Sequence, residues 1–97
     1  MRFAVLFTDN EDFATKRQEF MKDHLGFLKS NLESIQAAGP MFDTEGVGAG
    51  GMWLVEAAST KDVMRLVEED PFFDTGLRKD IEIREWRLVF EQGEAKI

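Results

Sequence analysis

The single histidine of the chain, His24, is the side chain best suited to move protons near neutral pH. Phe20 lies four residues before it and Phe27 three residues after it, so in a helix these side chains share one side. The imidazole ring would then emerge from apolar surroundings. A single histidine on a helix is more often structural or exposed than catalytic, so a catalytic role also requires a partner.

A carboxylate that accepts one ring N–H would orient the histidine and stabilise its protonated form. Asp23 is adjacent in the sequence, but neighbours in a helix point about 100° apart, which makes it a poor partner. Asp70 is the better candidate, because it ends a second predicted helix that packs on the same face of the sheet as the first. Asp74, further along the same loop, is a weaker candidate.

The other residues indicate no second kind of site. Without cysteine there is no thiol nucleophile, disulfide or cysteine-ligated zinc, and the hydroxyl side chains lack a second histidine for a triad. One histidine and scattered carboxylates make no recognisable set of metal ligands. The glycine-rich segment 46–51 joins two predicted strands instead of opening a helix, so it is a hairpin loop and not a dinucleotide-binding fingerprint. We expect neither a metal nor a cofactor.

The chain has 97 residues, enough for one small domain, and a net charge of −7. This charge argues against nucleic acid or an anionic membrane as partner, because both favour clustered Lys and Arg. Arg78, Lys79, Arg84 and Arg87 are interleaved with acidic residues and indicate a mixed, solvated surface. No apolar run fits a signal peptide or the ~20 residues of a membrane span. We expect a cytoplasmic protein that binds a small molecule.

The apolar pattern predicts an α+β fold. Strands are expected over residues 2–8 and 80–91 and on both sides of the glycine-rich turn within 41–58, and helices over 15–37 and 59–70. This order is that of the ferredoxin-like βαββαβ fold, in which both helices cover one face of a four-stranded antiparallel sheet. We expect one domain over residues 1–97, with a frayed tail at 92–97.

The predicted first helix depends on apolar residues at three- and four-residue steps from Met21 to Ile35. Thr15 is expected to cap its start, and Gly39-Pro40 to end it. The second helix is expected to be capped by Ser59 or Thr60. A loop over residues 70–76 follows it, because proline and glycine break regular structure there.

Both faces of the predicted sheet are apolar. In the first predicted strand, Phe3, Val5 and Phe7 face one side and Ala4 and Leu6 face the other. In the third strand, Trp53 and Val55 lie opposite Met52 and Leu54. In the last strand, Ile81 and Ile83 have one parity and Trp86, Leu88 and Phe90 have the other. Two helices cover one face only, and a large exposed apolar surface is rare in a monomer. We therefore predict a homodimer that packs sheet against sheet. The alternative is that a loop or the C-terminal tail covers the second face.

Short motifs follow one another in a characteristic order. They are His24-Leu25 with apolar residues behind, Gly39-Pro40, Gly50-Gly51 in the hairpin, Asp70-Pro71-Phe72 followed by Gly76, and Trp86 in the last strand. In this order they resemble the YCII-related family of small ferredoxin-like proteins. The resemblance runs over nearly the whole chain, and the order carries more weight than any single motif.

The resemblance implies a dimeric α/β-barrel, in agreement with the two apolar faces. It also implies a His–Asp dyad at a pocket, here His24 and Asp70. Family members related to muconolactone isomerase and chlorohydroquinone dehydrochlorinase suggest proton transfer on small cyclic compounds. The family often has Arg-Pro just before the histidine, where this chain has Met21-Lys22. Arg17, somewhat more than one helical turn upstream, is the candidate to replace that arginine.

The leading functional hypothesis is a cofactor-independent lyase or isomerase. His24 would take a proton, and Asp70 would accept the other ring N–H. The remaining expected site residues are Gly39 and Pro40 as a pocket wall, and Phe72 or Phe73 to exclude water. The alternatives are a non-enzymatic small-molecule-binding module, an accessory subunit, and a cofactor-free monooxygenase on a similar dimeric fold.

Overall fold

Four antiparallel strands form the main sheet of the protein, whose computed structural model describes residues 1–97. They are β1 (Arg2–Asp9), β2 (Ile35–Phe42), β3 (Gly48–Glu56) and β4 (Arg78–Glu85), in the spatial order β2-β3-β1-β4. Each strand runs antiparallel to its neighbours. The predicted α+β fold with a four-stranded antiparallel sheet is confirmed.

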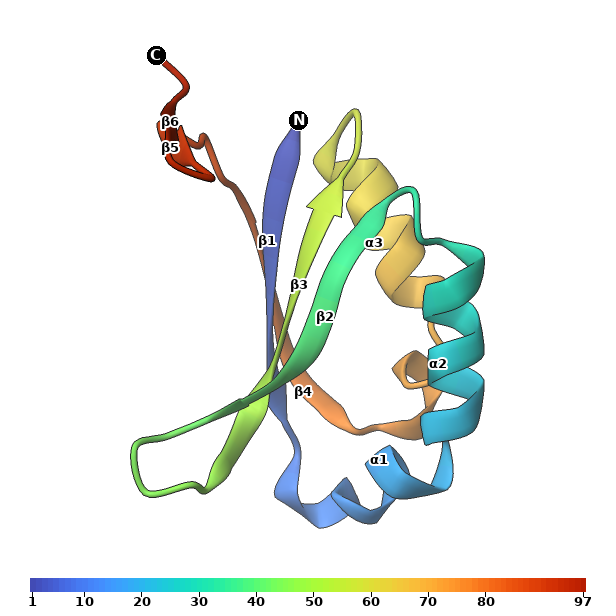
Figure 1. Ribbon diagram of the computed structural model, residues 1–97. Coiled ribbons are helices and arrows are strands. Elements are labelled where there is room, and N and C mark those ends of the chain that lie inside the picture. The colour runs from blue at the N-terminus through green and yellow to red at the C-terminus, as the bar shows by residue number, and fades with distance from the viewer.

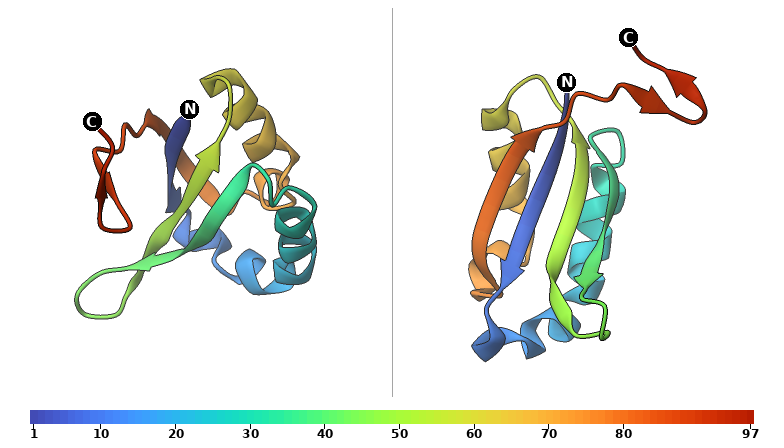
Figure 2. Two further views of the ribbon diagram at one scale, coloured as in Figure 1. Left: turned by 45° about the horizontal axis from the view of Figure 1, so that its top comes forward. Right: turned by 90° about the vertical axis from the view of Figure 1, so that its left-hand side faces the viewer.

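Three α-helices, α1 (Thr15–Glu19), α2 (Met21–Ser30) and α3 (Thr60–Glu69), lie on one side of this sheet (Figure 1). With the sheet turned towards the viewer, the helices lie behind it (Figure 2). Short 3-10 turns at Glu11–Phe13 and Phe73–Thr75 precede α1 and follow α3. None of the helices combines the length and the apolar character that crossing a membrane requires.

The hydrophobic core lies between the sheet and the helices. Alternate residues of β1 and β3 point into it, because successive side chains of a strand face opposite ways. In the antiparallel register Val5 stands opposite Trp53, and Phe3 stands opposite Val55. The buried members of the core cluster are Phe3, Val5, Phe7, Ile35, Trp53, Val55, Val63 and Val67.

The structure divides the single helix predicted over residues 15–37 into two helices and a strand. Helices α1 and α2 meet at Phe20, α2 ends at Ser30, and β2 begins at Ile35. The apolar spacing misled the prediction because Ile35 is buried as the strand partner of Val55, while Leu32 is 67% exposed. Pairing with β3 outweighs the helical period here.

Thr15 does not cap the first helix. Ala14 occupies the N-cap position of α1 and makes no side-chain hydrogen bond. In contrast, the predicted cap of the second helix is confirmed, because the Asp62 N–H donates to Oγ of Ser59 at 3.2 Å. Serine at this position satisfies a backbone donor that the helix itself leaves free.

Gly39 and Pro40 do not end a helix but lie within β2, where they pair with Met52 and Gly51. Strand β2 is at the edge of the sheet, and an edge strand accommodates a proline, which has no N–H to donate. Gly51 also belongs to a strand, so the hairpin turn is confined to residues 43–47 between β2 and β3.

Gly50 has a structural reason to be glycine. Its φ is +113°, and a Cβ at this position would lie 1.9 Å from the backbone oxygen of Phe7. A side chain would therefore force β1 and β3 apart. The glycines that the sequence assigned to the turn thus serve in part to bring two central strands close together.

The last strand is shorter than predicted. Strand β4 ends at Glu85, which pairs with Phe3, and β1 begins only one residue before Phe3, so little backbone remains for pairing. Trp86, Leu88 and Phe90 therefore lie outside β4 and do not form a second face of it. The final residues form a hairpin of β5 (Phe90–Glu91) and β6 (Glu94–Ala95) that projects from the body of the protein (Figure 1). The tail at 92–97, expected to be frayed, contains β6.

The face of the sheet turned away from the helices has two parts. Ala4 and Leu6 of β1 and Met52 and Leu54 of β3 are half-buried there and are direct cross-strand neighbours. Glu82 and Arg84 of β4 stand opposite Leu6 and Ala4 in the register, so this edge is polar. The second apolar face predicted from the sequence is therefore present on β1 and β3 and absent from β4.

Candidate active site

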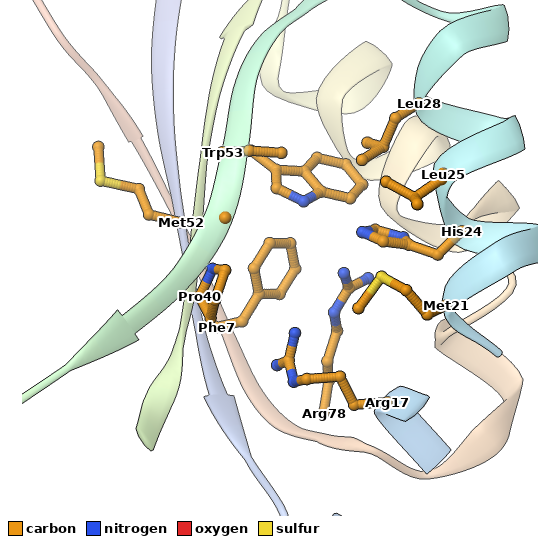
Figure 3. Close-up of a pocket in the computed structure, with 13 residues that line it drawn as sticks. Phe7, Arg17, Met21, His24, Leu25, Leu28, Pro40, Met52, Trp53 and Arg78 are labelled. Atoms are coloured by element: carbon orange, nitrogen blue, oxygen red, sulfur yellow. The ribbon is translucent and has the colours of Figure 1, made fainter. Parts of the chain in front are cut away.

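A cavity of about 120 Å³ opens between the sheet and helices α1 and α2 (Figure 3). It is lined by apolar side chains, two arginines and the histidine. The lining residues are Phe7, Arg17, Met21, His24, Leu25, Leu28, Ala38, Gly39, Pro40, Gly51, Met52, Trp53 and Arg78. For comparison, an apolar cavity of roughly 150 Å³ holds one benzene molecule, so this cavity is of the size of a single ring.

His24 is the only buried residue of α2. Figure 3 shows its ring pointing from the helix into the cavity. The ring stacks on that of Phe72, with centroids 4.1 Å apart and an angle of 16° between the planes. Phe72 is fully buried, so it forms a fixed surface behind the imidazole.

Asp70 reaches His24 from the end of α3. It is the C-cap residue, and its extended backbone, with ψ of 132°, is typical of a residue before proline. Nδ1 of His24 lies 2.8 Å from Oδ1 of Asp70, although 46 residues separate the two in the sequence. The Phe72 N–H donates to the same oxygen at 3.1 Å. Helices α2 and α3 thus bring the two side chains together on the inner side of the sheet.

This contact assigns the tautomer of the histidine. An ionised carboxylate can only accept hydrogen bonds, so Nδ1 of His24 carries the proton that it shares with Asp70. In a neutral imidazole the other nitrogen, Nε2, then has a free electron pair. The ring can therefore accept a proton at Nε2 while Asp70 keeps it oriented.

Arg78, the first residue of β4, is a third member of this group. Its Nη2 lies 2.8 Å from Oδ2 of Asp70, and its side chain is 5% exposed. The guanidinium carbon is 3.8 Å from the ring centre of Phe7 and 5.1 Å from that of Trp53. Asp70 thus contacts His24 through one oxygen and Arg78 through the other.

Sequence reasoning missed Arg78 because it placed this arginine on a solvated surface. If the side chains of this strand alternated regularly, Arg78 would lie on the outer face together with Asp80 and Glu82. However, the pairing of β1 with β4 shifts between Thr8, which pairs with Asp80, and Asp9, which pairs with Arg78. This irregularity turns Arg78 inward. No local signal in the sequence indicates it.

The charges around Asp70 favour its ionised form. Burial raises the pKa of the Asp70 carboxyl, but the hydrogen bond from His24, the charge of Arg78 and the N–H of Phe72 outweigh this and hold the pKa below its usual value. Burial lowers the pKa of the Arg78 guanidinium, and the Asp70 carboxylate only partly offsets this effect. Asp70 therefore serves as a fixed negative charge and not as a proton donor.

Arg17 lines the cavity, and one nitrogen of its guanidinium is paired with Asp9. Its Nη2 is 2.9 Å and 2.7 Å from the two carboxylate oxygens of Asp9. Its guanidinium carbon is 5.6 Å from the ring centre of Phe72. Arg17, Gly39 and Pro40, which were expected to bind substrate, all line the cavity, and their binding role stays a prediction.

Phe72 and Phe73 were expected to exclude water from the site, and this role stays a prediction. Neither lines the cavity: Phe72 lies behind the His24 ring, and Phe73 packs against the hydrophobic core. The polar candidates that the sequence weighed against Asp70 are also elsewhere, because Asp23 and Asp74 are exposed. No group of three or more histidine or carboxylate side chains is arranged to hold a metal ion.

Comparison with protein families matches residues 1–87 to the YCII-related domain. Among solved structures, the chain is similar to 5-chloro-2-hydroxyhydroquinone dehydrochlorinase from Burkholderia phenoliruptrix AC1100, in complex with 2,5-dihydroxybenzoquinone. The TM-score is 0.79 and the identity 26%, over 90% of this chain and 94% of that chain. This structural match assigns the fold to the dimeric α/β-barrel class. No curated protein gives a significant match.

Proposed function

From the premise that the chain belongs to the YCII-related family, we propose that it is a cofactor-independent enzyme of the lyase or isomerase type. Its substrate is a small cyclic or acidic metabolite, and its reaction begins with proton transfer to His24. The observation that supports this most strongly is the 2.8 Å contact between His24 and Asp70 at the edge of a ring-sized cavity.

In the proposed reaction, Nε2 of His24 takes a proton from carbon or from a hydroxyl group of the substrate. The electron pair of the broken bond stays on the substrate, where it expels a leaving group or takes up a proton at another atom. The first outcome is a lyase reaction and the second an isomerisation. Asp70 accepts the Nδ1–H throughout and stabilises the imidazolium. A base positioned in this way contributes roughly 10²–10⁴-fold in rate.

The cavity supports a substrate with one ring. Its walls are Trp53, Leu25 and Leu28 on the apolar side, and Gly39 and Pro40 on the side of β2. The similar dehydrochlorinase, by its name, acts on a chlorinated hydroxyhydroquinone, and its structure holds a dihydroxybenzoquinone. Both are compounds with a single six-membered ring that bears oxygen atoms.

The enzyme is proposed to act as a homodimer that packs through the outer faces of its sheets. Met52 and Leu54 of β3 line an open apolar hollow on this face with Met41 and Trp86, and the latter two are 44% and 45% exposed. The core of a protein interface is depleted of charge and rich in aromatic residues and methionine, as this hollow is. The helices of the same chain do not cover it (Figure 2).

The test is turnover by purified protein, with 5-chloro-2-hydroxyhydroquinone as the first compound and chloride release and ring products as the readouts. We expect His24→Gln to lower the rate by about 10²–10⁴-fold. The matched control is Asp23→Asn, which changes the adjacent exposed carboxylate and is expected to keep the rate.

A rate that His24→Gln leaves unchanged would exclude the dyad as the proton-transfer device. Recovery of unaltered ligand from a panel of single-ring oxygenated compounds, each shown to bind, would favour the non-enzymatic binding module instead.

A further inference from the structure

We infer that Arg78 is the anion anchor of the cavity, and that the ligand is a single-ring compound with an ionised oxygen that accepts a hydrogen bond from Arg78. This ligand class belongs to the same cavity as the proposed function. The proposed function is needed only to take this cavity as the binding site.

One atom of Arg78 has no partner. Nη2 forms an ion pair with Oδ2 of Asp70 but no hydrogen bond of good geometry, and Nη1 is buried with no hydrogen-bond partner within the protein. Buried polar groups are nearly always hydrogen-bonded, so an unpaired guanidinium N–H beside a cavity indicates a missing acceptor. Arg78 itself is one of the residues that line the cavity.

The guanidinium is also held in place. The ring of Phe7 lies 3.8 Å from its central carbon, the ring of Trp53 5.1 Å and that of Phe72 5.5 Å. With Asp70 on one edge, these rings leave little freedom to rotate. An arginine fixed in this way binds an oxygen at a defined place, whereas a flexible surface arginine does not.

The ionisable side chains that line the cavity are basic, although the protein as a whole is acidic. The chain has a net charge of −7, yet the ionisable residues that line the cavity are Arg17, His24 and Arg78, and no aspartate or glutamate is among them. Asp9 and Asp70 contact the arginines from outside the lining. Asp70 moreover divides its oxygens between Arg78 and His24. The lining therefore presents N–H donors, and no carboxylate, to a ligand.

The positions of donor and base fit one reaction. Figure 3 shows the side chains of His24, from α2, and Arg78, from β4, directed towards the same space. When His24 removes a proton from a ring compound, negative charge develops on a ring oxygen in conjugation with the broken bond. A fixed guanidinium beside that oxygen stabilises the charge without having to reorganise. Arg78 would thus act both in binding and in stabilising the intermediate.

The test compares two probes that have the same ring and nearly the same size, benzoate and benzamide, by calorimetry at neutral pH. We expect the wild-type protein to bind benzoate about tenfold or more tightly than benzamide, because a charge-assisted hydrogen bond is stronger than a neutral one. Arg78→Met should abolish this preference and Arg78→Lys should reduce it. The control Arg65→Met, at an exposed arginine of α3, should keep it.

The wild-type comparison can overturn the inference even if an Arg78 variant does not fold. Benzoate binding that is no tighter than benzamide binding, including no binding of either, overturns the inference. His24→Gln separates the two proposals, because it should lower the turnover rate by about 10²–10⁴-fold and keep the preference for benzoate. A benzoate preference that is lost in Arg78→Met, without turnover of any compound, would leave Arg78 as the anchor and contradict the enzyme. Turnover that depends on His24, without a preference for benzoate, would support the enzyme and contradict the role of Arg78 as anchor.

Discussion

The two faces of the central strands carry similar apolar side chains but meet different surroundings. On the inner face, Phe3, Val5 and Val55 are buried beneath helices of the same chain. On the outer face, Ala4, Leu6 and Leu54 are only half-buried, and no helix covers them. One face is thus completed by the chain itself, and the other is not.

The difference extends to the charged residues. Behind the inner face, Asp70 and Arg78 are buried and contact each other and His24 with defined geometry. At the outer face, Glu82 and Arg84 form an exposed ion pair along one strand. Buried charges depend on their partners, whereas exposed pairs contribute little to stability. The buried charges of the inner face are therefore expected to depend on one another, whereas those of the outer face are not.

The largest expected effect on stability is that of Asp70→Asn. The substitution leaves Arg78 buried without its counter-charge, and removing one partner of a buried ion pair costs about 3–5 kcal/mol. The measurement is the free energy of unfolding in urea at one protein concentration. Asp74→Asn, at an exposed position of the same loop, serves as the control and should stay within about 0.5 kcal/mol of wild type. Equal losses in the two variants would mean that the inner charges do not depend on each other.

The outer face is tested by Leu54→Asp. If this face is the dimer interface, an unpaired carboxylate there should raise the dissociation constant of the dimer about a hundredfold or more, because burying it costs several kcal/mol. Sedimentation velocity over a range of concentrations measures this. Leu32→Glu, at a position 67% exposed after α2, is the control and should leave the dimer intact. A wild-type protein that is monomeric at all concentrations would contradict the proposed assembly.

The inner face also depends on the helix that covers it. Ser59→Ala removes the side-chain cap of α3 and should lower the free energy of unfolding by about 1 kcal/mol. Thermal or urea unfolding followed by circular dichroism gives the value. Thr60→Ala, at the next residue, whose side chain makes no cap hydrogen bond, is the matched control. A loss from Thr60→Ala as large as that from Ser59→Ala would assign the effect to something other than the cap.

The smallest expected effect is a dependence on pH at the acid end. Because the folded state lowers the pKa of Asp70 below its ordinary value of 3.8, its stabilising contribution is complete above that pH. It is lost as the pH falls further, through the folded-state pKa. The difference in unfolding free energy between wild type and Asp70→Asn should therefore shrink only below about pH 3.8. A difference that already shrinks well above that pH would contradict the lowered pKa.

The inner face shows which features the sequence predicts well. The alternation in β1 and β3 and the Ser59 cap are local patterns, and the structure confirms them. The start of β2 at Ile35 was not predictable from spacing, because it depends on pairing with β3. The sequence pattern pointed to Asp70 through the common face of the two helices and through family resemblance. Arg78 was missed because a register shift against β1, and not its own neighbours, turns it inward.

The protonation state of the His24 ring, measured by nitrogen-15 NMR, tests the role of Asp70 most directly. Because the chain has one histidine, the two ring nitrogens give signals that need no assignment between residues. We predict that the neutral ring carries its proton on Nδ1, shared with Asp70, and that Asp70→Asn disturbs this arrangement while Asp74→Asn does not. A neutral ring protonated on Nε2, or one that is the same with and without the Asp70 carboxylate, would contradict the proposal that Asp70 prepares His24 as the base.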